Sequence, residues 1–163
     1  MVEPLRMDIS RIAPEGYRHL LALEQALGSK IEPRLLHLIK LRASQINGCA
    51  FCIGMHTSEA LRDGDSPERL LLLDAWHESS AFSEQERAAL RWVEEITRIS
   101  EGHAPKDAFE GLRQHFSEEE VAWLTIASAL INTWNRISIA SRAEFNPAML
   151  RKIVEEQKAV EPA

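Results

Sequence analysis

The sequence predicts an all-α fold, with seven or eight helices in a single-domain bundle. Helix start and stop signals recur along the whole chain, whereas the alternation of apolar and polar residues that marks strands is nearly absent. A length of 163 residues suits one domain with a sizeable core, and neither a repeat nor a linker divides it. We therefore expect one domain over residues 1–163, with its core at about 15–145 and a short C-terminal helix and tail at about 146–163.

Proline and glycine frame the first two predicted helices. Pro14 opens an apolar-periodic stretch that Gly28 closes, and Pro33 opens a second that ends at Asn47-Gly48. Proline suits the first position of a helix, and glycine suits the position just after its end. The sequence thus predicts helices over residues 14–28 and 33–47.

The third predicted helix runs from about Cys49 to Arg62 and stops before Gly64. A fourth, shorter helix follows, because Ser66-Pro67 combines an N-cap residue with a proline at the first helical position. Its apolar residues continue to residue 76 of the chain.

Two capping boxes predict the starts of the next two helices. Ser83 with Glu86, and Ser117 with Glu120, each combine a capping hydroxyl with a glutamate three residues later. Apolar residues at helical spacing follow the first box, so we expect that helix to continue as far as Gly102.

The helix after the second box is apolar on almost every face over residues 121–140. Such a helix must be buried in a bundle or in an interface between subunits. Asn146-Pro147 then precedes a last short helix at about 148–157, and the tail at 158–163 is expected to fray.

Composition and charge narrow the function classes. The net charge is −6, from 19 basic and 25 acidic residues, and no basic block gives reason to expect nucleic acid as a partner. No apolar run is long enough to predict a membrane span or a signal peptide. Two cysteines do not make a disulfide framework, so we expect a protein of the reducing cytoplasm, with no membrane partner.

The most informative motif is Cys49-Ala-Phe-Cys52 followed by His56. The three side chains share one face of the predicted helix, and both cysteines lie at its start. There the unpaired amide groups and the positive end of the helix dipole stabilise a thiolate.

Three interpretations of this motif compete. The cysteines could be small packing residues. They could bind a metal ion in a Cys₂His₂ site with His56 and with His37 from the preceding helix, although ligands crowded on one short helix face do not favour this. Finally, they could form a redox pair, in which one cysteine attacks an oxidant, the other resolves the product to a disulfide, and His56 moves the proton. We favour the redox pair.

The segment from Leu41 to Thr57, which contains Asn-Gly-Cys-x-x-Cys-x-x-x-His, resembles the signature of the carboxymuconolactone decarboxylase superfamily. The branch that it resembles is that of the alkylhydroperoxidase AhpD. Further segments are similar to the same branch, so the resemblance covers roughly residues 15–145; these segments are Trp76–Ser79, Phe82–Glu84 and Trp134–Arg136.

The resemblance implies an AhpD-like, cofactor-free enzyme that reduces hydroperoxides and assembles into homo-oligomers, as trimers or hexamers. It implies that Cys52 is the peroxidatic cysteine, that Cys49 is the resolving thiol and proton donor, and that His56 belongs to the proton relay. A dithiol or disulfide reductant, not identified by the motif, would reopen the disulfide. The decarboxylases proper lack the cysteine pair, which disfavours lactone decarboxylation. A disulfide reductase with little peroxidase activity remains an alternative, as does a non-catalytic or metal-binding bundle.

One departure from the family pattern concerns the proton relay. The family relay has a glutamate twelve residues before the first cysteine, where this chain has His37. A histidine is not an anionic partner at neutral pH, so His37 is only a possible relay residue. Glu59 could orient His56 instead, because residues three apart are neighbours on a helix. Tyr17 and Glu24 of the first predicted helix could line the same pocket.

Overall fold

The computed structural model describes residues 4–148 and 150–152. Within these residues every regular element is a helix and none is a strand, so the all-α prediction is confirmed. The elements are α1 (Ile9–Ile12), α2 (Pro14–Gly28), α3 (Pro33–Asn47), α4 (Ala50–Arg62), α5 (Pro67–Leu71), the 3₁₀ helix η1 (Leu72–Glu78), α6 (Glu84–Thr97), α7 (Ile99–Gly102), α8 (Lys106–Arg113) and α9 (Glu118–Ser141).

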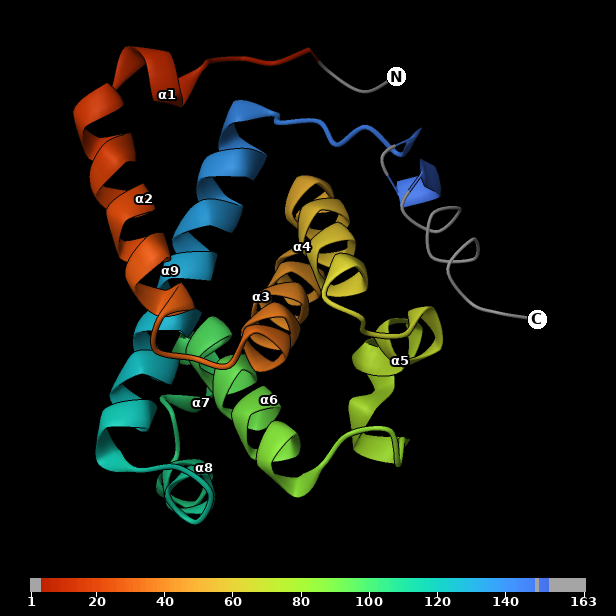
Figure 1. The fold of residues 1–163 in the computed structure, drawn as a ribbon. Helices are drawn as coiled ribbons and strands as arrows, with labels where there is room; N and C mark the ends of the chain where they lie inside the picture. Colours follow the sequence, from red (N-terminus) through yellow and green to blue (C-terminus); the bar gives the residue numbers. More distant parts are fainter. Residues whose placement is uncertain (1–3, 149, 153–163) are drawn as a thin grey trace.

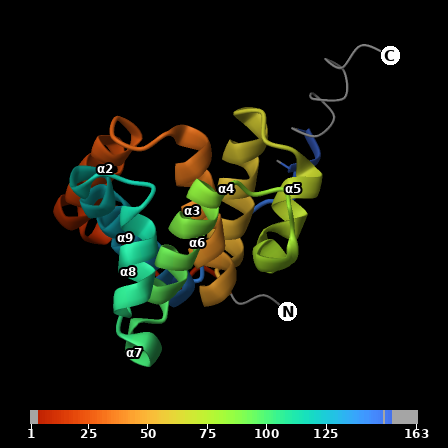
Figure 2. The same ribbon diagram turned by 90° about the horizontal axis from the view of Figure 1, so that it is seen from below.

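Helix α3 occupies the middle of the molecule and packs against α4, α6 and α9. Figures 1 and 2 show α2 and α9 on one side of it and α4 and α5 on the other. Its apolar residues belong to two hydrophobic cores, because they lie on two faces of the helix. Leu36 and Ile39 join a core with α2, α6, α8 and α9, whereas Leu38 and Leu41 join a second core with α4, α5 and η1.

The helix boundaries around the cysteine motif follow the sequence signals closely. Helix α3 ends at Asn47, and Gly48 closes it in the left-handed conformation with a φ of 67°. Glycine adopts this conformation without the steric cost that a Cβ atom imposes. Cys49 is the N-cap of α4, so the CxxC pair lies at a helix N-terminus as predicted.

Both predicted capping boxes are present. The Ser83 hydroxyl accepts from the Glu86 backbone amide, and the Glu86 carboxylate accepts from the Ser83 amide in return. Ser117 and Glu120 make the same exchange at the start of α9.

Other parts of the helix prediction need correction. The helix expected to reach Gly102 breaks at Arg98, which has a φ of −101° and a ψ of 37°. Ile99 is 47% exposed beyond the break, so its apolar side chain does not extend the buried stripe of α6. The sequence does not predict the short helices α1 and α8, because four and eight residues are too few to establish a helical period. The helix predicted at 148–157 lies mostly, and the tail at 158–163 lies wholly, outside the described residues.

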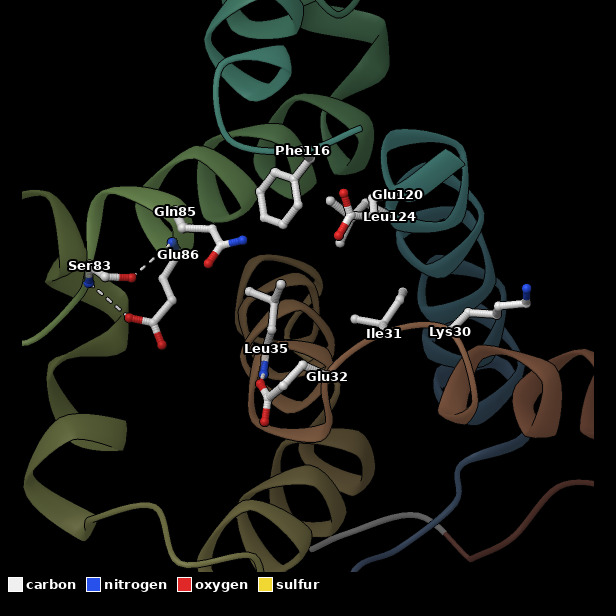
Figure 3. Close-up of a pocket in the computed structure, with 10 residues that line it drawn as sticks. All are labelled: Lys30, Ile31, Glu32, Leu35, Ser83, Gln85, Glu86, Phe116, Glu120 and Leu124. Atoms are coloured by element: carbon white, nitrogen blue, oxygen red, sulfur yellow. Dashed lines mark hydrogen bonds between the residues drawn. The ribbon is translucent and has the colours of Figure 1, made fainter. Parts of the chain in front are cut away.

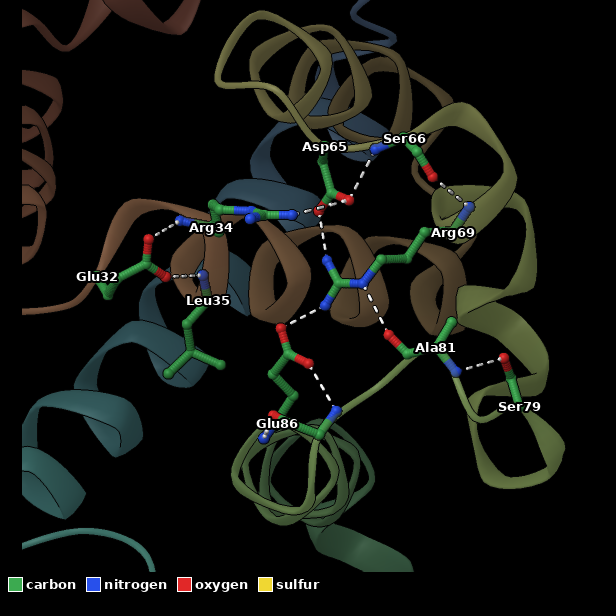
Figure 4. A network of polar contacts seen from close by, with 10 residues as sticks. Glu32, Arg34, Leu35, Asp65, Ser66, Arg69, Ser79, Ala81 and Glu86 are labelled. Carbon is green, nitrogen blue, oxygen red and sulfur yellow. Dashed lines mark hydrogen bonds and ion pairs between the residues drawn. The ribbon is translucent and has the colours of Figure 1, made fainter.

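A buried arginine ties the segment after α4 to helix α6. Arg69 donates to Asp65 Oδ2 at 2.6 Å, to the Ala81 carbonyl at 3.0 Å and to the Glu86 carboxylate. Figure 4 shows its guanidinium between the two carboxylates. Because Asp65 is buried, these bonds supply the partner that its charge requires. Among the described helices, none is long and apolar enough to cross a membrane.

Candidate active site

The two cysteines form a close pair at the start of α4. Both thiols are free and only 1% exposed, and their sulfurs lie 2.7 Å apart, with Cys49 as donor and Cys52 as acceptor. The backbone N–H of Cys52 donates to Cys49 Sγ at 3.4 Å, which makes Cys49 the side-chain cap of the helix. A helix N-terminus thus holds both sulfurs in one place.

The surroundings shift the pKa values of the two thiols in opposite directions. The hydrogen bond from Cys49 stabilises the Cys52 thiolate, and Asn135 and Ser138 assist it; against the effect of burial, these bonds lower the pKa of Cys52 to about 7. The same bond to Cys52, together with burial, raises the pKa of Cys49. As the pH rises through about 7, Cys52 therefore becomes the thiolate while Cys49 keeps its proton.

A layer of buried amides and hydroxyls from α9 lies against the cysteines. Ser138 Oγ is 3.7 Å from Cys52 Sγ. Asn135 donates to Ser44 Oγ at 2.9 Å and accepts from Asn47 Nδ2 at 2.8 Å, which fixes α9 to α3. From the sequence we predict that Asn132, Asn135 and Arg136 tie helices or subunits together, but not that Asn135 and Ser138 act on a cysteine. Their spacing of three residues within an otherwise apolar helix is the signal that could have indicated this.

His56 is buried on the same helix, and a carboxylate orients it. Its Nδ1 atom lies 2.7 Å from Glu59 Oε2, whereas its buried Nε2 atom has no hydrogen-bond partner. Burial lowers the pKa of His56, and the hydrogen bond and charge of Glu59 oppose that effect only in part. Burial would raise the pKa of Glu59, but its bond to His56 and the nearby positive charges lower it. The pair is thus a neutral imidazole held by an ionised carboxylate.

His37 lies beyond Glu59 from His56. Its Nε2 atom is 2.7 Å from Asp63 Oδ2, and its Nδ1 atom is 3.8 Å from Glu59 Oε2. A line of alternating histidines and carboxylates therefore leads from His56 through Glu59 and His37 to Asp63, whose side chain is half exposed. Within residues 4–148 and 150–152, no three histidine, cysteine or acidic side chains converge as metal ligands, so the geometry does not favour the Cys₂His₂ alternative.

A pocket of about 400 Å³ opens beside the site, and we call it the His56 pocket. Tyr17 and Glu24 line it, as expected, together with His56, Glu59 and Ser138. Its remaining walls come from α2, α4 and α9, from Ala143 and from the N-terminal residues Leu5 and Met7–Ser10, and they are mostly apolar. Because Ser138 touches both the pocket and Cys52, the pocket reaches the immediate surroundings of the reactive sulfur.

A second pocket, of about 190 Å³, has no such chemistry. It lies between the starts of α3, α6 and α9, and Leu35 and Phe116 face each other across it (Figure 3). Neither a cysteine nor a histidine lines it. We therefore place the candidate active site at the His56 pocket.

Comparison with known proteins decides the family. Residues 14–95, which contain Cys49, Cys52 and His56, match the model of the carboxymuconolactone decarboxylase family. The uncharacterized protein YdfG of Bacillus subtilis is 42% identical over 136 residues, which are 83% of this chain and 92% of that protein. The chain belongs to the carboxymuconolactone decarboxylase family. This confirms the resemblance that the motif carries.

One solved structure agrees with the AhpD-like branch, and a more distant one shares the fold. A protein of unknown function from Agrobacterium tumefaciens, described as a candidate AhpD antioxidant defence protein, is 47% identical. The likeness has a TM-score of 0.85 and covers 88% of this chain and 99% of that one. The debrominase Bmp8 shares the fold at 22% identity, with a TM-score of 0.74 over 88% of this chain and 77% of its own.

Proposed function

We propose that this protein is a cytoplasmic thiol-dependent peroxidase that reduces hydroperoxides through a dithiol–disulfide cycle of Cys49 and Cys52. One observation carries the proposal: two free thiols lie 2.7 Å apart, in surroundings that lower the pKa of Cys52 and raise that of Cys49. A low thiol pKa favours attack on peroxide, and a protonated neighbour supplies the proton that the leaving group needs.

The cycle is balanced in three steps. The Cys52 thiolate attacks the terminal oxygen of ROOH, an S–O bond forms, the O–O bond breaks, and the alcohol leaves with the proton of Cys49. The Cys49 thiolate then attacks the sulfenic sulfur of Cys52, and the departing hydroxide takes a proton to become water. An external dithiol breaks the resulting Cys49–Cys52 bond and is itself oxidised to a disulfide, which restores the Cys49 thiol and the Cys52 thiolate and releases one proton to solvent.

His56 is suited to supply the proton that converts hydroxide to water. Its Nδ1 atom is engaged by Glu59, so the lone pair of Nε2 takes up a proton from the pocket side and then passes it to the hydroxide. Glu59 acts here as a positioning residue, in the way that the family's upstream glutamate is expected to act. His37 and Asp63 would return protons to solvent, which gives His37 a relay role different from that of the glutamate it replaces.

Oxidation with limiting hydroperoxide tests the proposal. Mass spectrometry of the peptide that holds both cysteines should show the loss of two hydrogens in the wild type. Cys52→Ser should abolish turnover, whereas Cys49→Ser should consume one equivalent of peroxide, form a sulfenic acid and then stop.

Two other results would point to the alternatives. Slow reaction with every hydroperoxide, combined with fast exchange with a small disulfide, would indicate a disulfide reductase. Stoichiometric zinc that blocks alkylation of both thiols, in protein purified without tags or chelators, would indicate a metal-binding bundle.

A further inference from the structure

Two asparagines from distant segments of the chain meet beside the cysteines. Asn47 belongs to the Asn-Gly-Cys sequence at the end of α3, and Asn135 belongs to the Trp-Asn-Arg sequence within α9. The Asn47 Nδ2 atom donates to Asn135 Oδ1 at 2.8 Å. Asn135 is 0% exposed, so its amide needs partners inside the protein, and their positions decide which way it points.

Two neighbours fix the direction of the Asn135 amide. The Ser44 hydroxyl gives its hydrogen to the Lys40 carbonyl at 2.7 Å, so toward Asn135 it can only accept. Asn135 Nδ2 therefore lies on the side of Ser44, to which it donates at 2.9 Å. Its Oδ1 lies on the side of Asn47, which donates to it. A half-turn of the amide would bring two acceptors together at Ser44 and two donors together at Asn47.

The direction of Asn47 is fixed in turn by a second amide. Its Nδ2 group also donates to Asn132 Oδ1, at 2.9 Å. Arg136 donates to the same oxygen at 2.9 Å, and a guanidinium cannot accept a hydrogen bond. The Nδ2 group of Asn132 faces the other way and donates to Thr97 Oγ1 at 2.9 Å. The charged donor thus sets one direction that passes through Asn132 and Asn47 to Asn135.

One hydrogen of Asn135 Nδ2 remains for the cysteines. An amide nitrogen carries two hydrogens, and Ser44 takes one of them. Beside the stronger effects of the bond between the two thiols and of burial, the Asn135 amide lowers the pKa of both Cys52 and Cys49. A thiolate accepts such a bond strongly, whereas a disulfide sulfur accepts it weakly. The donor therefore stabilises the reduced pair more than the oxidised pair.

We propose that Asn135 sets the redox balance of the cysteine pair: its amide N–H donates to the reduced sulfurs, in an orientation held by Asn47 and Ser44. The consequence is a Cys49–Cys52 disulfide that is easier to reduce, because stabilising the reduced form raises the reduction potential. This role rests on the proposed function only in that the two cysteines cycle between dithiol and disulfide, and it does not depend on peroxide.

Equilibration with glutathione measures this balance. Two glutathione thiols break the Cys49–Cys52 bond and become glutathione disulfide; one proton stays on Cys49, and the other stays on Cys52 or passes to solvent as the thiolate forms. Asn135→Leu keeps a branched side chain but removes the donor. The equilibrium constant for reduction should therefore fall at least tenfold, which lowers the reduction potential by about 30 mV.

A second measurement needs no oxidation. The thiolate absorbance of reduced Asn135→Leu at pH 7 should be about fivefold lower than that of the wild type, as expected when the pKa of Cys52 rises by about one unit from about 7. A side chain that only supported the packing of α9 would change the stability of the protein without this loss of thiolate.

A matched pair of variants separates orientation from general loosening. Asn47→Ala leaves Ser44 as the one remaining anchor of the Asn135 amide, so the equilibrium constant for reduction should fall by about threefold. Thr97→Val removes an acceptor of Asn132 at the far end of the network and leaves the bonds of Asn135 in place. It should lower the stability in urea denaturation but change neither the equilibrium constant nor the thiolate absorbance.

The outcomes are separate from those of the peroxidase proposal. Unchanged values in folded Asn135→Leu, or equal shifts in Asn47→Ala and Thr97→Val, would overturn the inference. If Asn135→Leu does not fold, Asn47→Ala decides through the same two measurements, and unchanged values there would overturn it as well. A wild type that forms no disulfide would reject the proposed cycle, and the thiolate absorbance of the variants would still decide the role of Asn135. Failure to reduce any hydroperoxide, with the shifts as expected, would reject the peroxidase alone.

Discussion

At the scale of single residues, the two sulfurs owe their difference to one hydrogen bond. Cys49 donates to Cys52 at 2.7 Å, and this bond is the largest influence that lowers the pKa of Cys52 to about 7. The sequence predicts the pair and its helix N-terminus from spacing alone. It does not predict Ser138, because the approach of α9 to the first turn of α4 depends on how the whole bundle packs.

The titration of Cys52 provides the first prediction. As the pH rises through about 7 the Cys52 thiol should lose its proton, so the ultraviolet absorbance of the thiolate and the rate of reaction with peroxide should rise together. Cys49→Ala removes the donor and should raise the pKa of Cys52 toward its ordinary value. Cys49→Ser keeps an O–H donor and should give an intermediate pKa. Identical titration curves for the two variants would contradict this role of Cys49.

Glu59→Gln is the second prediction. The carboxylate charge raises the pKa of His56 against burial, so its loss should lower that pKa further and leave His56 less able to carry a proton at neutral pH. We expect turnover to fall by about tenfold or more, with the pH dependence assigned to His56 moved to lower pH. NMR titration of the His56 ring and steady-state kinetics check both parts.

A matched control for this variant is Glu68→Gln, which removes an exposed carboxylate from α5. It should leave the His56 titration and turnover unchanged. An equal loss of turnover in both variants, or an unchanged His56 titration in Glu59→Gln, would show that Glu59 does not act through the imidazole.

At the scale of the elements, local signals predicted helix ends well and helix continuity poorly. In the capping boxes at Ser83 and Ser117, both hydrogen bonds join residues within one stretch of four. The local sequence is therefore enough to predict them. The break at Arg98 depends on distant contacts. Thr97 accepts from Asn132 of α9 at 2.9 Å, which anchors the end of α6 while the following residues turn away. No local pattern contains that information.

Gly54→Ala is the prediction that belongs to this scale. A Cβ atom at Gly54, within α4, would overlap the ring of Phe145, which follows α9. Overpacking costs about 1–3 kcal/mol, and the better helix propensity of alanine returns about 1 kcal/mol of that. We therefore expect a net loss of up to about 2 kcal/mol in the free energy of unfolding, measured by urea denaturation.

Two further variants test this explanation. In a Phe145→Ala background the same Gly54→Ala change should become neutral or stabilising, because the overlap is gone. Gly111→Ala in α8, where nothing lies within 4 Å, should stabilise the protein by up to about 1 kcal/mol. If Gly54→Ala stabilises the wild type as Gly111→Ala does, the packing of Phe145 on α4 does not require a glycine.

At the scale of the whole molecule, buried charges join segments that the apolar cores leave apart. Arg42 of α3 bonds to Glu94 of α6 at 2.7 Å and also to Asp74 of η1, and Trp76 donates to Glu94 at 2.8 Å. The sequence shows Arg42 and Glu94 as ordinary helix-surface charges, because their burial results from the assembly of several helices; Asp74 stays exposed. The homo-oligomer that the family resemblance implies stays a prediction at this scale.

Arg69→Met is the prediction for the whole molecule. Arg69 contacts Asp65, Ala81 and Glu86, and its guanidinium lies 4.9 Å from the ring centroid of Phe82. Methionine keeps an apolar stem of similar length but leaves buried Asp65 without its closest cation. Breaking a buried pair in this way costs about 3–5 kcal/mol. Because Arg34 still lies 3.8 Å from Asp65, we expect the low end of that range.

Comparison with an exposed ion pair separates burial from charge as the origin of this loss. Arg91 and Asp107 form such a pair, with side chains 45% and 69% exposed, and Arg91→Met should cost less than about 1 kcal/mol. Hydrogen exchange should show faster opening of the segment from Asp65 to Phe82 in Arg69→Met. Exchange at the start of α4, from Cys49 to His56, should change little. Equal losses in the two variants would mean that this segment is held by its apolar contacts with α3 and α4, and that the arginine network adds only specificity.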